Sequence, residues 1–254
     1  MTPVFRVAIP ARHGSTRFPG KPLVEIAGAP VIEHVWRRAC EAGALEVVVA
    51  TDDERIAATA RGFGAEVCMT RPDHASGTDR LAEVAGARGW ADDDIVVNLQ
   101  GDEPLTPPAI LAQAAADLAA WPSAPVATLA APLDAGVAAD DPNLVKVVTD
   151  RDGFALYFSR APIPWWRDGR PAVPDPPTLR HIGIYAYRAG FLREYTGLAP
   201  APLERAEQLE QLRVLWHGHR IHVALADALP EAGIDSPADV ERVAGLLAAR
   251  GEGA

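Results

Sequence analysis

The sequence predicts an α/β fold in which helices flank a mostly parallel central sheet. Short apolar runs alternate with stretches of helical periodicity up to about residue 100, and glycine or proline stands between many of them. Strands that alternate with helices form βαβ units, and such units build parallel sheets. The chain has 254 residues, 48% of them apolar and 23% charged, which is ordinary for a globular protein with a sizeable core.

The first half of the chain gives the clearest pattern. Its first apolar run ends at Pro10, and the apolar residues of 31–39 recur at helical spacing up to Gly43, which stands where a helix often terminates. Thr78 is expected to cap a helix that runs to about Arg88. In chain order we predict strands at 4–9, 46–51, 65–69 and 94–100, and helices at about 31–39, 54–61 and 78–88.

These elements predict where ligands bind. Right-handed crossovers place the loops that follow parallel strands at one edge of the sheet, and α/β proteins bind ligands at that edge. The loops in question are 10–21, 70–78 and 100–104. We therefore expect the chemistry of this protein to lie in these three segments.

The second half is less regular. We predict strands at 124–131, 144–149, 154–160, 180–187 and 220–225, a helix at 204–216 and a last helix from Ser236. Six prolines and two tryptophans mark 161–177 as a loop, after which the strand pattern resumes. The interpretation is a single domain, 1–254, which contains a smaller dimerisation or lid element at roughly 132–190.

Charge and cysteine content limit the possible functions. The net charge of −10 gives no general attraction to nucleic acid or to an anionic membrane, so any phosphate site needs local cations. Cys40 and Cys68 lie in apolar stretches and are predicted to be small core residues rather than a disulfide framework. No signal peptide and no apolar run of about 18 residues is apparent, so a cytoplasmic protein without membrane insertion is expected.

The segment 12–21 follows the first predicted strand. It holds three cations (Arg12, Arg17, Lys21), the hydroxyls of Ser15 and Thr16, and two glycines. Small residues that expose backbone N–H groups, together with side-chain cations, are what a triphosphate needs. The segment is neither a Walker A loop nor a dinucleotide fingerprint, because its glycine spacing differs and Pro22 follows the lysine. The alternative interpretation is a solvated basic loop.

Two acidic segments are candidates for a metal site. Asp102 lies in Gln100–Pro104, directly after a buried strand, and Asp235 lies just before the last helix. Carboxylates at this edge are suited to hold Mg²⁺ on phosphate oxygens. Each also has a local explanation, because Gly-Asp is a common turn and an acid near a helix N-terminus is favourable.

The segment 71–80 joins a strand to a helix, and its small residues Ser76 and Gly77 would let backbone N–H groups approach a base edge. Other chemistries lack their motifs. No Cys-x-x-Cys pair or zinc-like histidine spacing occurs, and no Gly-x-Ser-x-Gly elbow exists for a hydrolase triad.

The chain resembles the 3-deoxy-manno-octulosonate (Kdo) cytidylyltransferases, also called CMP-Kdo synthetases, from Ile9 to about Glu241. The triphosphate segment is shared by many nucleotidyltransferases, whereas later stretches are more specific to the Kdo enzymes. The matching stretches are 9–12, 15–17, 19–23, 49–52, 68–71, 76–78, 97–104, 145–148, 155–160, 180–185 and 209–216.

The resemblance implies a Rossmann-like nucleotidyltransferase fold, a homodimer, and a Mg²⁺-dependent reaction in which CTP and Kdo give CMP-Kdo and pyrophosphate for lipopolysaccharide assembly. It implies triphosphate contacts for Arg12, Ser15, Thr16, Arg17 and Lys21, and cytidine contacts for Pro10, Ala11, Arg71, Ser76, Gly77 and Gln100. The implied metal ligands are Asp102 and Asp235, which with Arg12 and Lys21 form the catalytic set. The implied sugar contacts are Arg160, His181, Tyr185, Glu210 and Gln211.

Two alternatives remain at this stage. Within the same reaction class, the acceptor could be another acid sugar, such as sialic acid or the 8-amino analogue of Kdo. Outside that class, the chain could be a non-catalytic nucleotide-binding protein of the same fold. The presence of Lys21, Asp102 and Asp235 together argues against the second alternative.

Overall fold

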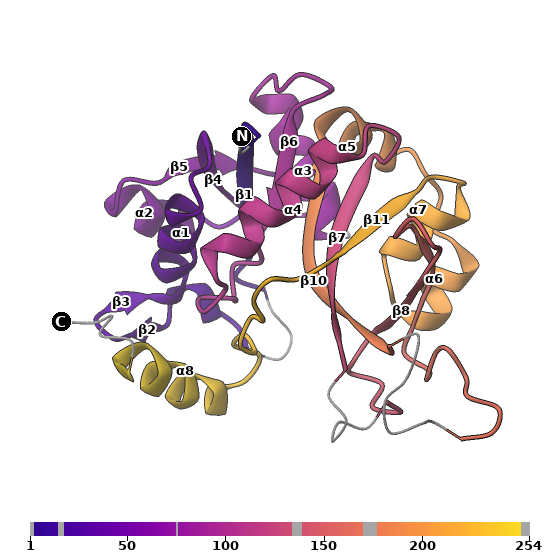
Figure 1. Cartoon of the computed structure of the whole chain (residues 1–254). Helices are drawn as coiled ribbons and strands as arrows, with labels where there is room; N and C mark the ends of the chain where they lie inside the picture. Colours follow the sequence, from indigo (N-terminus) through magenta and orange to yellow (C-terminus); the bar gives the residue numbers. More distant parts are fainter. Residues whose placement is uncertain (1–2, 15–17, 75, 134–138, 170–176, 250–254) are drawn as a thin grey trace.

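A central sheet flanked by helices on both faces makes up the molecule (Figure 1). The computed structural model describes residues 3–14, 18–74, 76–133, 139–169 and 177–249. The main path of the sheet has the strand order β11-β7-β10-β6-β1-β4-β5. The predicted α/β class with a mostly parallel sheet is thereby confirmed.

The parallel part of the sheet comes from the first half of the chain. β1 (Phe5–Ala11) lies between β6 (Ile95–Asn98) and β4 (Glu46–Thr51), and β5 (Glu66–Met69) pairs with β4. All four run in the same direction, so the segments that follow them meet at one edge. All four residues of β6 are buried, as its apolar run predicted.

The second half extends the sheet with mixed directions. β10 (Leu179–Arg188) runs antiparallel between β6 and β7 (Val126–Pro132), and β11 (Ile221–Leu225) runs parallel to β7. β8 (Lys146–Thr149) pairs antiparallel with both β10 and β9 (Ala155–Ser159). This arrangement brings residues of β10 beside the end of β6 and so beside the ligand-binding edge.

Two apolar layers hold the helices to the sheet. One face packs against α1 (Val31–Glu41), α2 (Glu54–Gly62), α4 (Pro108–Ala120) and α8 (Pro237–Ala249), and the other against α3 (Gly77–Ala87), α5 (Ala189–Tyr195) and α7 (Gln211–Trp216). Alternate residues of β1 pack into the two layers: Val7 and Ile9 belong to the first and Ala8 to the second. The remaining elements are η1 (Lys21–Leu23), β2 (Glu25–Ile26), β3 (Ala29–Pro30) and α6 (Pro202–Glu207).

Several predicted boundaries need correction. The helices α4 and α5 were not predicted, and the predicted helix 204–216 is two helices, because Gln208 adopts φ 54° and ends α6. Ser76, not Thr78, caps α3: its hydroxyl accepts a hydrogen bond from the N–H of Asp79 at 3.1 Å. Thr78 therefore lies inside the first turn, where its hydroxyl is available for another contact.

The prediction that both cysteines are core residues is wrong. Cys40 is exposed on α1, and Cys68 is half-buried on β5. In the part of the chain that the structure describes, no helix has the length and apolarity needed to cross a membrane.

Candidate active site

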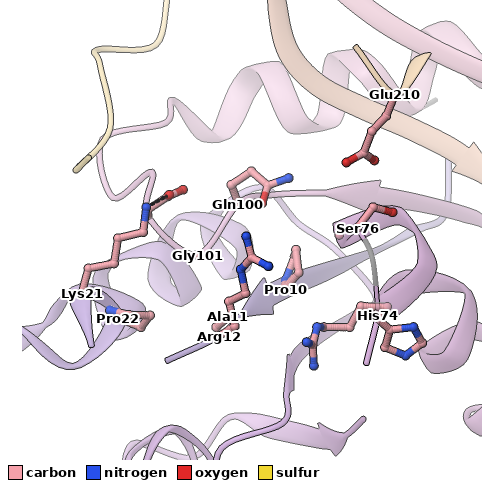
Figure 2. A pocket seen from close by; sticks show the side chains of 13 residues that line it. Pro10, Ala11, Arg12, Lys21, Pro22, His74, Ser76, Gln100, Gly101 and Glu210 are labelled. Carbon is pink, nitrogen blue, oxygen red and sulfur yellow. Dashed lines mark hydrogen bonds and ion pairs between the residues drawn. The ribbon is translucent and has the colours of Figure 1, made fainter. Parts of the chain in front are cut away.

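Two adjoining cavities lie at the carboxyl edge of the parallel strands. The first has a volume of about 300 Å³ and is lined by Pro10, Ala11, Arg12, Lys21, Pro22, His74, Ser76, Gly77, Arg80, Gln100, Gly101, Asp102 and Glu210. The second, of about 230 Å³, is lined by Gly77, Thr78, Asn98, Gln100, Val126, Tyr185, Tyr187, Tyr195, Gln208, Leu209, Glu210, Gln211 and Val214. Gly77, Gln100 and Glu210 belong to both walls, so the cavities meet there. Figure 2 shows Gln100 on one side of the first cavity and Glu210 beyond it.

The predicted triphosphate segment begins and ends at the first cavity. Its base is closed by a hydrogen bond from the N–H of Gly20 to the carbonyl of His13 at 3.0 Å, and Gly20 has φ 75°, which glycine adopts without strain. Arg12 enters from the end of β1 and Lys21 from the start of η1 (Figure 2). Ser15, Thr16 and Arg17 lie outside the described residues.

Lys21 joins the two predicted metal ligands. Its ammonium donates to Oδ2 of Asp102 and, at 3.2 Å, to the carbonyl of Ile234. Oδ1 of Asp235 lies 3.7 Å from the same nitrogen. The side chain of Lys21 is 12% exposed and that of Asp102 is 27% exposed, so this is a partly buried ion pair at the cavity wall. Three charged groups from three segments thus meet at one point.

Glycines allow this approach. A Cβ on Gly233 would lie 2.7 Å from the carbonyl oxygen of Asp102, and the N–H of Ile234 donates to that same oxygen at 2.9 Å. A Cβ on Gly101 would lie 2.9 Å from the carbonyl oxygen of Pro10. Any larger residue at either position would push these segments apart, so both glycines help to set the distance between the acids.

Asp235 does not serve mainly as the helix-entry residue. The carboxylate of Asp239 has that role, because its Oδ2 accepts from the N–H groups of Asp235 and Ser236 at 3.1 and 2.9 Å. The local explanation offered for Asp235 from the sequence is therefore weakened, while its side chain, 55% exposed, faces Lys21.

Glu103, which follows Asp102 in the chain, is a further acid of this group. Burial, and then the carboxylates of Asp102 and Asp235, raise the pKa of Glu103 to about 7, against the opposing effects of Thr106 and Lys21. Among the described residues, no three or more His, Cys, Asp or Glu side chains are arranged to hold a metal ion by themselves. A cation at Asp102 and Asp235 would therefore need further ligands from a substrate or water.

The predicted cytidine residues divide into two groups. Pro10, Ala11, Ser76, Gly77 and Gln100 all line the first cavity. Arg71 does not: its exposed guanidinium donates to the two carboxylate oxygens of Asp73 at 2.9 and 2.6 Å. In this structure Arg71 is thus held away from the cavity that the sequence assigned to it.

Arg80 and His74 line the first cavity but were not predicted as site residues. Arg80 is 4% exposed, donates to the hydroxyl of Thr70, and lies 3.5 Å from the carboxylate of Asp52. His74 contacts the carboxylate of Glu83. The sequence could have identified Arg80 as a site residue from its spacing, because it lies one helical turn after Ser76 and therefore on the same side of α3. Together with Arg12 and Lys21 it gives the first cavity three cationic side chains.

The predicted sugar residues cluster around the second cavity, with one exception. Tyr185, Glu210 and Gln211 line it. His181 lies beside it, its ring 5.2 Å from that of Tyr185. Arg160 is the exception, because its guanidinium donates to the carbonyls of Pro142 and Glu207, both at 2.7 Å. None of the described residues that line the second cavity is cationic.

The protonation of His181 follows from its surroundings. The hydroxyl of Thr128 donates to the carbonyl of Ile184 at 2.7 Å, so it accepts from Nε2 of His181 at 2.9 Å. This contact selects the tautomer with the proton on Nε2. Burial lowers the pKa of His181 to about 3, so the ring is neutral at physiological pH.

Glu210 connects the two cavities chemically as well as spatially. It accepts a hydrogen bond from the hydroxyl of Thr78 at 3.2 Å. Desolvation raises its pKa, although the side chain keeps access to solvent through the cavities. Thr78 is free for this contact because Ser76 caps the helix.

Comparisons with known proteins agree with this geometry. The family model described as cytidylyltransferase matches residues 7–221. The 3-deoxy-manno-octulosonate cytidylyltransferase of Pseudomonas syringae pv. syringae (strain B728a) is 57% identical over 252 residues, which cover 97% of this chain and 99% of that protein. The protein of the same name from Halorhodospira halophila (strain DSM 244 / SL1) is 56% identical over 97% of this chain and 98% of its own length.

Solved structures show the same relationship. The structure of a CMP:2-keto-3-deoxy-manno-octonic acid synthetase complexed with CTP superposes with a TM-score of 0.89 at 43% identity, over 98% of this chain and 100% of that chain. A cytidylyltransferase from Leptospira borgpetersenii serovar Hardjo-bovis (strain JB197) has a TM-score of 0.63 at 17% identity, over 97% of this chain and 87% of its own, and supports the fold alone.

Proposed function

Because this chain belongs to the 3-deoxy-manno-octulosonate cytidylyltransferase family, we propose that its adjoining cavities bind the two substrates of one reaction, CTP in the first and Kdo in the second. The enzyme transfers CMP from CTP to Kdo and releases pyrophosphate. The product, CMP-Kdo, is the activated sugar for lipopolysaccharide biosynthesis.

The observation that carries the assignment is the shared wall of the cavities. Gly77, Gln100 and Glu210 line both, so ligands that fill the two cavities meet at these residues. The first cavity has the cations that a triphosphate requires, in Arg12, Lys21 and Arg80, whereas the second offers amides and phenols suited to hydroxyl groups. The first cavity is therefore suited to the triphosphate and the second to the hydroxyl groups of the sugar.

The mechanism follows from this placement. The anomeric hydroxyl of Kdo attacks the α-phosphorus of CTP, the bond to the β-phosphate oxygen breaks, and pyrophosphate leaves while the hydroxyl loses its proton. Negative charge grows on phosphate oxygens during this step, so positioned cations supply most of the catalysis. Arg12 and Lys21 would stabilise this charge, and Gln100, Ser76 and the backbone at Gly77 would orient the nucleoside.

Asp102 and Asp235 would hold Mg²⁺. Their carboxylate oxygens are the donors that this hard cation prefers, and both already face one cationic group, the ammonium of Lys21. When bound, the ion would neutralise phosphate charge and favour the ionised form of the sugar hydroxyl. The carboxylates would fix where the positive charge lies, and Lys21 would keep them paired when the substrates are absent.

We also propose that the enzyme is a cytoplasmic homodimer. A separate groove of about 410 Å³ is lined by residues from 162–167 that include Trp165, which is 79% exposed. Apolar surface of this kind is typical of protein interfaces. Light scattering should give the mass of a dimer, and Trp165→Ser should increase the monomer fraction. A monomer for the unmodified chain would contradict the proposal.

The function is tested by release of pyrophosphate. CTP, UTP, ATP and GTP are each combined with Kdo, with its 8-amino analogue and with sialic acid. We expect efficient release with CTP and Kdo and poor release with the purine nucleotides. Equal turnover with ATP or GTP would contradict the cytidine assignment, and preference for another acid sugar would replace Kdo as the acceptor.

A further inference from the structure

Asn98 is a buried amide without a partner. The residue is 3% exposed, and its Oδ1 atom is shut off from solvent with no hydrogen-bond partner in the described part of the protein. It lies on β6, opposite Ala8 of β1 and Tyr185 of β10, and it lines the second cavity. Such atoms are rare in folded proteins because their desolvation is not compensated, so each calls for an explanation, such as strain, a functional role or a bound water or ion.

Two further amides and a phenol lie near Asn98 at the second cavity. Gln100 and Gln211 also line the second cavity, and their side-chain amides form no hydrogen bond with another described residue. Tyr185 lies directly across the strand pair from Asn98. An amide both donates and accepts, as a hydroxyl does, so a group of uncharged amides and a phenol is complementary to a polyhydroxylated ligand. Phosphate would instead call for the cations that line the first cavity.

We propose that Asn98 determines specificity for the acceptor: its carboxamide forms a hydrogen bond with a hydroxyl group of the polyhydroxylated acid sugar. This inference rests on the proposed function, since it assigns the sugar to the second cavity. Its basis is the unpaired amide itself: the hydrogen bonds that Asn98 lacks within the protein are supplied by the substrate. A sugar that lacks the hydroxyl leaves the amide unpaired and is therefore rejected.

The test measures KM for each substrate by pyrophosphate release in the wild type, in Asn98→Ala and in Asn98→Asp. We expect Asn98→Ala to raise KM for Kdo about tenfold, the effect of losing one good hydrogen bond, and to leave KM for CTP within about twofold. Asn98→Asp keeps an acceptor oxygen but replaces the amide donor with a second carboxylate oxygen, and the acid sugar is itself negatively charged, so this variant should also raise KM for Kdo. Asn143→Ala, a change in the chain's other asparagine at an exposed turn, is the matched control and should behave as the wild type.

A deoxy-sugar series makes the test specific. In the wild type, the analogue that lacks the contacted hydroxyl should have a KM about tenfold higher than that of Kdo. In Asn98→Ala the difference in KM between the two sugars should be much smaller, because that variant has already lost the contact. Urea unfolding separates a structural role: since the carboxamide oxygen of Asn98 has no hydrogen-bond partner among the described residues, Asn98→Ala should retain the wild-type midpoint to within experimental error.

The outcomes are distinct. Unchanged KM for Kdo in both variants would overturn the inference, because Asn98 would then have no role in binding the sugar. An equal rise in KM for CTP would also overturn it, because the contact would then belong to the nucleotide. If the wild type releases no pyrophosphate from CTP and Kdo, the proposed function itself fails. If Asn98→Ala does not fold, Asn98→Asp provides the same comparison.

Discussion

The ammonium of Lys21 and the carboxylate of Asp102 form a direct ion pair although 81 positions separate them in the sequence. The pair joins the loop after β1 to the loop after β6, two neighbouring parallel strands. Asp235, which precedes the last helix, lies 3.7 Å from the same ammonium. The groups proposed to stabilise the transition state are therefore already together in the protein without substrate.

Lys21→Met is expected to lower kcat by about 10²–10³-fold, the effect of removing one preorganised group that stabilises developing charge. Methionine keeps most of the aliphatic side chain. Since Lys21 is a partly buried partner of Asp102, the variant should also lose about 1–2 kcal/mol of unfolding free energy. Pyrophosphate release and urea unfolding measure the two effects.

The control for Lys21→Met is Arg37→Ala, which removes an exposed cation that pairs with Glu33 on α1. It should change neither kcat nor stability appreciably. Near-normal turnover of Lys21→Met would return the segment 12–21 to the alternative interpretation of a solvated basic loop.

Gly233→Ala tests the close approach of Asp235 to Asp102. The new Cβ would lie 2.7 Å from the carbonyl oxygen of Asp102, so the segment 233–235 must move away. We expect kcat to fall at least about tenfold, because small displacements of catalytic groups have large effects. Gly245→Ala is the matched control: it lies in α8 with open space around the added Cβ and should keep full activity while gaining up to about 1 kcal/mol of stability.

The pH dependence of stability should report the neutral state of His181. Burial lowers its pKa from 6.5 to about 3. Below pH 6.5 the unfolded chain binds a proton there and the folded protein does not, so the unfolding free energy falls as the pH falls from 6.5 towards 3. At pH 5 this amounts to about 2 kcal/mol.

The variant His181→Gln should remove that part of the pH dependence. Urea unfolding at pH 7.5 and pH 5 gives the comparison: the wild type should lose about 2 kcal/mol more than the variant between the two values. His217→Gln, at an exposed histidine, should keep the wild-type difference. If the wild type and His181→Gln lost the same unfolding free energy between pH 7.5 and pH 5, the ring of His181 would be protonated in the folded protein.

The sequence was sufficient for the features that depend on local pattern. The strand 46–51 was predicted with its observed bounds, and the three loops expected to carry chemistry do line the first cavity. Parallel strands impose this outcome, since it needs only the order of strands and helices. The helix α4 was missed because its many alanines, as in Ala114 and Ala115, obscure the apolar stripe by which helices are recognised.

Side-chain partners were less predictable. Arg71 pairs with Asp73 and Arg160 with the carbonyls of Pro142 and Glu207, so neither guanidinium lines the cavities. Such choices depend on which groups folding brings near, not on spacing in the chain. For the same reason, neither the raised pKa of Glu103 nor the unpaired amide of Asn98 has any signature in the sequence.

The variants Asp102→Asn and Asp235→Asn decide whether the two acids act as one unit. If each has only a local role, either change should leave catalysis intact and alter stability by about 1 kcal/mol at most. If both hold Mg²⁺, each should lower kcat by about 10²-fold or more, with partial recovery at higher Mg²⁺, because an amide oxygen is a weaker ligand than a carboxylate. The fall in kcat of the double variant should then be far smaller than the product of the falls in the two single variants.

Asp239→Asn is the matched control for this series. Its carboxylate accepts from the N–H groups of Asp235 and Ser236 at the start of α8. The change should therefore reduce stability, but because both proposed Mg²⁺ ligands keep their carboxylates, the Mg²⁺ dependence of turnover should stay unaltered. Titration of Mg²⁺ against pyrophosphate release in all four variants measures the difference. A shared metal site would be contradicted if the double variant lost the product of the two single losses in kcat, or if either single variant kept full activity. Two ligands of one ion act together, so their effects on kcat cannot be independent.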